Sequence, residues 1–185
     1  SNIKRLMAYS SISHIGYALA GIATGTNSGI QSTIIYLTIY LVMNLGAFGC
    51  IFALKRENVF YENINDLSGI SKHHPMLALS FLIIFFSLAG IPPLAGFFAK
   101  FHVFMAVIEV KMYTLAIIGL ITTVISAFYY LRVIKIVYFD KAKTPFEENY
   151  DLGLKAILIL TSVMILIYFI YPSILIDAVS NITII

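Results

Sequence analysis

Charged residues are scarce in this chain: they occupy 11% of its 185 positions, whereas hydrophobic residues occupy 60%. The mean hydropathy is +0.93. Soluble globular domains carry roughly a quarter charged residues, so this chain lacks the polar side chains needed to cover a surface in water. The composition excludes an ordinary soluble protein, and we expect lipid rather than nucleic acid around it.

Cysteine is almost absent, and so are the sequence motifs of redox and nucleotide-binding proteins. The single thiol, Cys50, cannot form an internal disulfide or hold an iron–sulfur cluster. The sequence has no glycine-rich dinucleotide fingerprint, no P-loop and no Cys/His cluster with metal-binding spacing. We therefore expect no cofactor, metal ion or redox centre in this chain.

Long apolar stretches dominate what is present. Each is long enough to cross a hydrocarbon core of ~30 Å, which takes about 20 helical residues. Backbone groups in lipid must be satisfied within the segment, which favours helices. The sequence therefore predicts an all-α integral membrane unit over residues 1–185 with about five transmembrane helices. The expected spans are residues 6–24, 30–54, 76–109, 112–139 and 155–176.

Basic residues are distributed unevenly between the two sides that these spans define. One side holds only Lys111. The other side holds Lys4, Arg5, Lys55, Arg56, Lys72, Arg132, Lys135, Lys141, Lys143 and Lys155. Cytoplasmic loops carry an excess of Lys and Arg, so we expect the N-terminus in the cytoplasm or matrix. The expected location is a bacterial inner membrane or the mitochondrial inner membrane.

The third stretch, residues 76–109, contains a helix-breaking sequence. As one straight helix it would be ~50 Å long, too long for the hydrocarbon core without a tilt or a break. Gly90, Pro92 and Pro93 lie near its middle, and the prolines remove backbone donors and clash with the preceding turn. We expect a discontinuous helix here, and transporters use such helices to build ion sites.

Lys100 follows this break and lies far from either polar end of its span. An ammonium at the centre of a membrane costs at least about 2.5–3.5 kcal/mol on insertion scales, so such a residue is by default part of an ion or proton path. The sequence favours Lys100 as a proton carrier. The alternative is a structural lysine paired with a backbone carbonyl or with a carboxylate of another subunit.

Polar residues recur at helical spacing on three neighbouring spans. These residues are Ser10, Ser13, His14 and Tyr17; Thr33, Tyr36, Tyr40 and Asn44; and Thr122, Ser126, Tyr129 and Tyr130. If they face a common interior, they line a proton path beside Lys100, and the expected lining residues are His14, Tyr40, Asn44, Ser126 and Tyr130. The alternative is ordinary packing between helices, which also uses small and hydroxyl residues.

Four segments resemble a known family, the antiporter-like, proton-conducting membrane subunits of respiratory complex I. Residues 3–17 (IKRLMAYSSISHIGY) and 124–133 (VISAFYYLRV) carry two of its motifs. Residues 43–48 (MNLGAF) and 87–101 (SLAGIPPLAGFFAKF) resemble subunit N in particular, the counterpart of mitochondrial NADH dehydrogenase subunit 2. Tyr36, Tyr40 and Asn44 occupy the helix on which the sibling subunits carry a histidine, which also favours subunit N.

This resemblance implies a membrane subunit of a proton-pumping NADH–quinone oxidoreductase. The family has fourteen transmembrane helices, and this chain would supply the last five, with Lys100 as the buried lysine of the discontinuous twelfth helix. The chain would contribute the outer half of a proton path, while NADH and quinone are used by the whole complex. Its partners would be the other membrane subunits.

Two other interpretations remain open at this stage. The same helices occur in multisubunit Na⁺/H⁺ antiporters, so the chain is also compatible with an antiporter subunit. The other interpretation is a non-functional split-gene fragment.

The chain begins with Ser1 rather than Met. We therefore expect it to be part of a longer or split protein, with the preceding helices on a separate chain.

Overall fold

Helical rods form almost all of the protein in a computed structural model, which describes residues 2–56, 59–146 and 151–182. Ser1, on which the expectation of a longer protein rests, lies outside these ranges. The long elements are α1 (Ile3–Ala23), α2 (Asn27–Phe52), α4 (Pro75–Ala89), α5 (Ala95–Glu109), α6 (Tyr113–Phe139), α7 (Leu152–Ile170) and α8 (Ser173–Ser180). The expected all-α architecture is confirmed.

The helices begin where the sequence supplies capping groups. The Asn2 side chain accepts a hydrogen bond from the Arg5 N–H and caps α1. The Thr26 side chain accepts from the Gly29 N–H and caps α2. Pro75 occupies the first turn of α4, where its missing N–H costs nothing. These caps satisfy backbone donors that have no partner within the helix.

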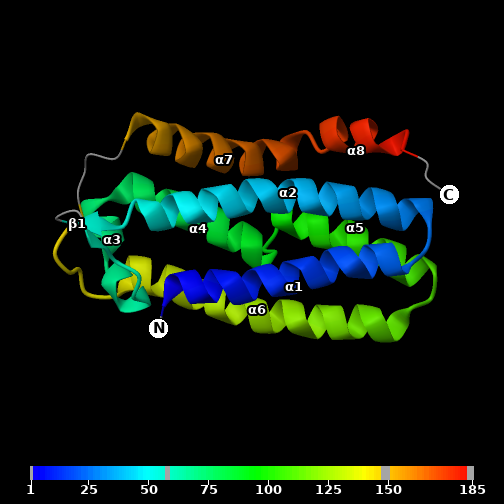
Figure 1. The fold of residues 1–185 in the computed structure, drawn as a ribbon, viewed down its shortest axis with the longest axis horizontal. Helices are drawn as coiled ribbons and strands as arrows, with labels where there is room; N and C mark the ends of the chain where they lie inside the picture. Colours follow the sequence, from blue (N-terminus) through cyan, green and yellow to red (C-terminus); the bar gives the residue numbers. More distant parts are fainter. Residues whose placement is uncertain (1, 57–58, 147–150, 183–185) are drawn as a thin grey trace.

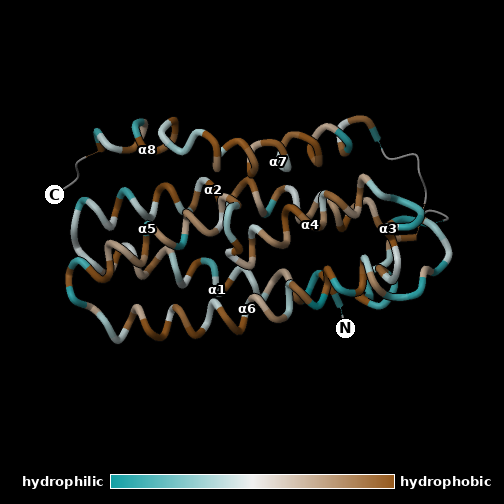
Figure 2. Tube along the Cα trace, turned by 180° about the vertical axis from the view of Figure 1, so that it is seen from behind, coloured by the Kyte–Doolittle hydropathy of each residue, from teal (hydrophilic) through white to brown (hydrophobic). Residues whose placement is uncertain are grey.

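In Figure 1, α5 continues the direction of α4 and α8 that of α7; counted in this way as single rods, the successive rods run in alternating directions. Three of them, α2, α6 and α7, are each long and apolar enough to cross a membrane, and α4 is a shorter apolar helix. The helix α1 does not meet this hydropathy criterion, because its Ser, His and Tyr residues lower its average. The polar ends and apolar middle of the bundle are visible in Figure 2.

Short elements gather at one end of the bundle, near the N-terminus (Figure 1). They are β1 (Lys55–Arg56), β2 (Val59–Phe60), the 3-10 helix η1 (Ile64–Leu67) and α3 (Ile70–His73). The basic residues that the sequence placed on one side of the membrane belong to this end, which we call the basic end. The opposite end, which contains Lys111, is called the Lys111 end.

Ionic contacts join the segments of the basic end. Lys4 pairs with Glu62 at 2.7 Å, and Lys143 pairs with Asp66 at 3.3 Å. The hydrogen bonds from Lys4 and Asn2 lower the pKa of the exposed Glu62 carboxyl below its ordinary value. These contacts tie the loop before α4 to the start of α1 and to the loop before α7.

Arg56 makes a further connection at this end. Its guanidinium lies over the Tyr61 ring at 4.7 Å and over the Phe146 ring at 5.1 Å. The same side chain donates to the backbone carbonyls of Thr144 and Pro145. The Phe146 N–H in turn donates to the His74 Nε2 at 3.1 Å, just before α4 begins. The loops preceding α4 and α7 are therefore joined to each other.

The expected break in the third span is confirmed. The helix α4 ends at Ala89 and α5 begins at Ala95, with Gly90, Pro92 and Pro93 between them. Gly90 adopts φ +84°, a left-handed conformation that glycine accepts without strain. The Ser87 hydroxyl accepts a hydrogen bond from the Gly96 N–H at 2.9 Å, which ties the two halves together.

The last span differs from the prediction of one helix over residues 155–176. The helix α7 ends at Ile170 and α8 begins at Ser173, with Pro172 at the interruption. Proline lacks an N–H and disfavours the helical conformation of the preceding residue, which explains the break. The Gln31 side chain donates to the carbonyls of Ser180 and Ile182, both at 3.1 Å, and holds the α8 end against α2.

The tight contact at Gly96 gives a first prediction. A Cβ at Gly96 would overlap the Ser87 carbonyl group and lie 3.1 Å from the Met43 sulfur. We expect Gly96→Ala to push α5 away from α4 and to lower the free energy of unfolding by about 1–3 kcal/mol, as overpacked sites do. Thermal unfolding of the protein in detergent micelles measures this change.

Gly153→Ala is the matched control. A Cβ at Gly153 meets only an Asp151 carboxylate oxygen, at an ordinary 3.5 Å. This variant should unfold at the same temperature as the unchanged protein or slightly above it, because alanine favours helices over glycine. Equal behaviour of the two variants would show that the α4–α5 contact is not tightly packed.

Candidate functional site

Lys100 lies at the break between α4 and α5 and is 4% exposed. Its Nζ donates hydrogen bonds to the carbonyl oxygens of Leu88, at 3.1 Å, and Ala89, at 3.2 Å. These carbonyls belong to the last turn of α4, where helix carbonyls lack partners within the helix. The C-terminus of a helix also carries partial negative charge, which favours a cation. The break therefore creates the acceptors that hold the lysine.

Gly90 leaves room for this arrangement. A Cβ at Gly90 would lie 3.2 Å from Lys100 Nζ and 3.1 Å from its Cδ. The ion pairs among the described residues, Lys4–Glu62, Lys135–Asp140 and Lys143–Asp66, do not include Lys100. The ammonium is thus held by neutral carbonyls, which is the backbone pairing of the structural alternative. Carbonyl dipoles stabilise the positive charge of Nζ.

Tyr17, which is 4% exposed, covers the other side of the ammonium. Lys100 Nζ lies 5.2 Å from the centroid of the Tyr17 ring, within the range of a cation–π interaction. The Tyr17 hydroxyl is hydrogen-bonded to the hydroxyls of Thr122, at 3.1 Å, and Thr123, at 2.9 Å, on α6. Tyr17 therefore connects α1 to both α5 and α6.

His14 forms the centre of a buried hydrogen-bond network between α1, α2 and α6. It is 1% exposed. Its Nδ1 is 2.7 Å from the Tyr36 hydroxyl, and its Nε2 is 3.1 Å from the Tyr130 hydroxyl. The Tyr130 hydroxyl is also hydrogen-bonded to Ser10. The polar faces of the three spans meet at these residues, as the helical spacing suggested.

The other expected path residues have different surroundings. The Tyr40 ring stacks on His14 at a centroid distance of 4.6 Å, and its hydroxyl donates to the Ser11 Oγ at 2.8 Å. Ser126 donates to the Thr123 carbonyl within its own helix, at 2.7 Å. Asn44 is half-buried, and its Oδ1 has no hydrogen-bond partner among the residues that the structure describes. Asn44 is therefore not joined to the His14 network here.

Sequence reasoning missed two participants, Ser11 and Thr123. Each lies one position away from the polar face assigned to its helix, and each still reaches a buried tyrosine hydroxyl. A hydroxyl residue adjacent to the predicted face was the available signal. Tyrosine side chains are long enough to reach a hydroxyl displaced by one position around a helix.

A cavity of about 230 Å³ adjoins Tyr17 between α1, α5 and α6. Ser13, Tyr17 and Thr122 supply its hydroxyl groups, and Phe104 and Ile118 are among its apolar lining residues. The lining continues along each of these three helices toward the Lys111 end, through Ala20, Val107 and Leu115. Tyr17 therefore borders both the lysine and this cavity.

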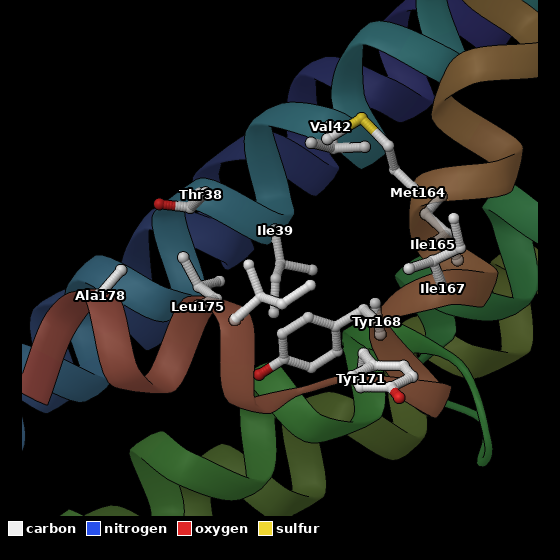
Figure 3. Close-up of a pocket in the computed structure, with 12 residues that line it drawn as sticks. Thr38, Ile39, Val42, Met164, Ile165, Ile167, Tyr168, Tyr171, Leu175 and Ala178 are labelled. Carbon is white, nitrogen blue, oxygen red and sulfur yellow. The ribbon is translucent and has the colours of Figure 1, made fainter.

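A larger cavity, of about 350 Å³, lies beside the second helix break, between α2, α7 and α8 (Figure 3). Aliphatic side chains such as Ile39, Met164 and Leu175 make up most of its lining. The Tyr168 hydroxyl is buried there without a hydrogen-bond partner in the described ranges. This cavity lacks the chain of hydroxyl and imidazole groups that proton transfer needs, so the candidate site is the one around Lys100.

Within residues 2–56, 59–146 and 151–182, no three His, Cys, Asp or Glu side chains are close enough to hold a metal ion. Cys50 is buried, with none of its side chain exposed. The titratable groups in the bundle interior that bear on the site are therefore the lysine, the histidine and the tyrosines described above.

Comparison with known proteins places these features in context. NADH-quinone oxidoreductase subunit N of Pelagibacter ubique is 60% identical over 185 residues, which is 100% of this chain and 39% of the relative. The corresponding subunit of Parvibaculum lavamentivorans is 53% identical over 96% of this chain and 37% of the relative. The chain thus spans less than half the length of these relatives.

Solved structures show the same arrangement of helices. A chain of respiratory complex I from Thermus thermophilus, solved with bound aureothin, matches with a TM-score of 0.81 and 28% identity over 97% of this chain and 40% of that one. A chain of the Mrp complex from a Dietzia species matches in fold, with a TM-score of 0.83 and 21% identity over 93% of this chain and 40% of that one. The family model described as the transmembrane part of NADH:quinone oxidoreductase and Mrp antiporter subunits matches residues 1–126. This chain belongs to that family, the NADH:quinone oxidoreductase/Mrp antiporter membrane proteins.

Proposed function

We propose that this chain is part of a membrane subunit of a proton-pumping NADH–quinone oxidoreductase and that Lys100 carries the proton. The observation that carries the proposal is a buried ammonium at a helix break, held by two neutral carbonyls and a tyrosine ring and without an ion-pair partner in the described part of the chain. Such a charge is costly in a membrane and marks an ion or proton path. The 60% identity to a subunit N favours this complex over other members of the family.

The proton would pass along groups that already lie close together. Tyr130, His14 and Tyr36 form one hydrogen-bonded chain, and imidazole and hydroxyl groups can both donate and accept protons. Tyr17 lies next to this chain, with its ring centroid 6.1 Å from His14 and 6.0 Å from Tyr36. Water beside Tyr17 would complete the connection to Lys100, which releases its proton toward the Lys111 end.

The electron-transfer reaction would take place in other subunits, which would use NADH and quinone. A positive charge displaced toward Lys100 by a neighbouring subunit would favour release of the lysine proton, because like charges repel strongly at low dielectric. The basic end would face the cytoplasm or matrix. The remaining helices of such a subunit would lie on the rest of the same protein or on a separate chain.

Sodium–proton exchange in an Mrp-type complex is the second candidate, and the family model covers both activities. The two candidates differ in what co-purifies with the chain and in the transported ion. Proton pumping that requires NADH and quinone and is unaffected by Na⁺ supports the oxidoreductase. Transport driven by a Na⁺ gradient without electron transfer would favour the antiporter.

Replacing the lysine tests the central claim. Lys100→Met in the assembled complex should lower proton transfer through this subunit by at least about a hundredfold, the low end of what a proton-transfer group contributes. Proton uptake by inverted membrane vesicles, measured per NADH oxidised, reports the change. Lys111→Met is the matched control, because it removes an exposed lysine at the far end of α5.

Unchanged pumping by the Lys100→Met complex would contradict proton carriage by this residue. It would leave the structural alternative, in which the lysine only joins α5 to α4. A complex that fails to assemble with Met but assembles and pumps with Lys100→Arg would also favour the structural alternative, because arginine keeps the positive charge but does not release its proton.

His14→Phe tests the hydrogen-bond network that would bring protons to Lys100 from the basic end. Phenylalanine retains an aromatic ring but removes the ring nitrogens that contact Tyr36 and Tyr130. We expect slower coupled turnover and fewer protons pumped per NADH, because the lysine is reprotonated more slowly. Tyr9→Phe, at a position of α1 that is 68% exposed, should behave like the unchanged protein. Full pumping by His14→Phe would remove the histidine from the path.

A further inference from the structure

Tyr17 lies beside the proton path described above but has no role of its own in it. Its ring lies next to the Lys100 ammonium, and its side chain also lines the 230 Å³ cavity between α1, α5 and α6. The Phe104 and Tyr17 rings pack edge to face, with their centroids 6.0 Å apart, and Phe104 also lines the cavity. The two rings thus line the cavity together, and one of them also lies against the ammonium.

The hydroxyls of Tyr17, Thr122 and Thr123 can all be hydrogen-bonded at the same time. Thr122 Oγ1 donates to the Gly119 carbonyl at 2.8 Å, and Thr123 Oγ1 donates to the same carbonyl at 3.0 Å. Each threonine has only one hydroxyl hydrogen, so when both threonines donate to the Gly119 carbonyl, their oxygens are left to accept from Tyr17. In that arrangement the Tyr17 O–H is the donor, shared between two acceptors on α6. This contact fixes the ring without involving Lys100.

We propose that Tyr17 is a gating and positioning residue that separates Lys100 from this cavity, and that the cavity is the route by which the proton leaves. The inference rests on the proposed function of Lys100. With the hydroxyl bound to Thr122 and Thr123, the ring shields the ammonium from water and stabilises its charge. When the hydroxyl leaves the threonines, water from the cavity reaches Nζ.

The proton balance of this step is simple. Nζ gives one proton to a water molecule in the cavity, and the resulting hydronium leaves toward the Lys111 end while the lysine becomes neutral. The lysine then regains one proton through water on the His14 side. If Tyr17 closes between the two events, the released proton does not return along the same route. Tyr17 itself neither gains nor loses a proton. It acts by controlling the access of water to Lys100.

Thiol accessibility tests the gate separately from proton carriage. In the assembled complex, Lys100→Cys with Cys50→Ala places one reporter thiol behind the Tyr17 ring. A membrane-impermeant thiol reagent is added from the Lys111 side, and modification of the peptide containing residue 100 is followed by mass spectrometry. We expect slow modification with Tyr17 present and at least tenfold faster modification with Tyr17→Leu.

Two further variants separate the ring from its hydroxyl. Tyr17→Phe keeps the barrier but loses the hydrogen bonds, so its modification rate should fall between those of Tyr17 and Tyr17→Leu. The double change Thr122→Val and Thr123→Val removes both acceptors with little change in side-chain size and should match Tyr17→Phe. This double variant also tests the proposal if Tyr17→Leu fails to assemble. Tyr9→Leu is the matched control and should leave the rate unchanged.

Three results would overturn the gate. They are rapid modification of residue 100 with Tyr17 intact, equal rates for Tyr17 and Tyr17→Leu, and no effect of the double threonine change. None of these measurements depends on proton pumping, since the reporter protein lacks the lysine. A failed gate with loss of pumping in Lys100→Met would therefore leave the proposed function in place. The reverse pattern would remove the proton carrier and its exit route and leave Tyr17 only as a barrier to water.

Discussion

A buried ammonium in a membrane needs hydrogen-bond acceptors, and this protein supplies them by interrupting a helix. In a continuous helix the carbonyls of Leu88 and Ala89 would accept from residues 92 and 93, but these are prolines and have no N–H to donate. The interruption frees these carbonyls and aims them at Lys100. The prolines, the left-handed glycine and the lysine are therefore parts of one arrangement, and removing any of them changes the others.

The hydroxyl and imidazole groups around this centre explain why three apolar helices carry polar faces. His14 joins α1 to α2 and α6, and Tyr17 joins α1 to α5 and α6. Such contacts pack helices together and also arrange groups that exchange protons. In this bundle the hydrogen bonds that join the helices are the same ones along which the proposed proton path would run.

Much of this could be predicted from the sequence. The long helices follow from the lengths of the apolar stretches, and the break at residues 90–93 follows from backbone chemistry. The break at Pro172 was missed, because the apolar composition continues through it and a single proline near a span's end resembles a terminus. Which of the polar residues touch could not be predicted, since spacing gives a face but not the rotation of one helix against another. Asn44 lies on the predicted face and remains outside the network for this reason.

The two interrupted helices, α4–α5 and α7–α8, are preceded by loops that contact each other. Arg56 lies against Tyr61 and Phe146, and Phe146 is bonded to His74 directly before α4 begins. The segments leading into α4 and α7 are thereby fastened together at the basic end. Each of these two interrupted helices is thus anchored on one side of its break and connected by a short non-helical segment to the half beyond it. Any rearrangement at the breaks would displace α5 and α8 against a fixed base, and Lys100, carried by α5, would move relative to its own acceptors.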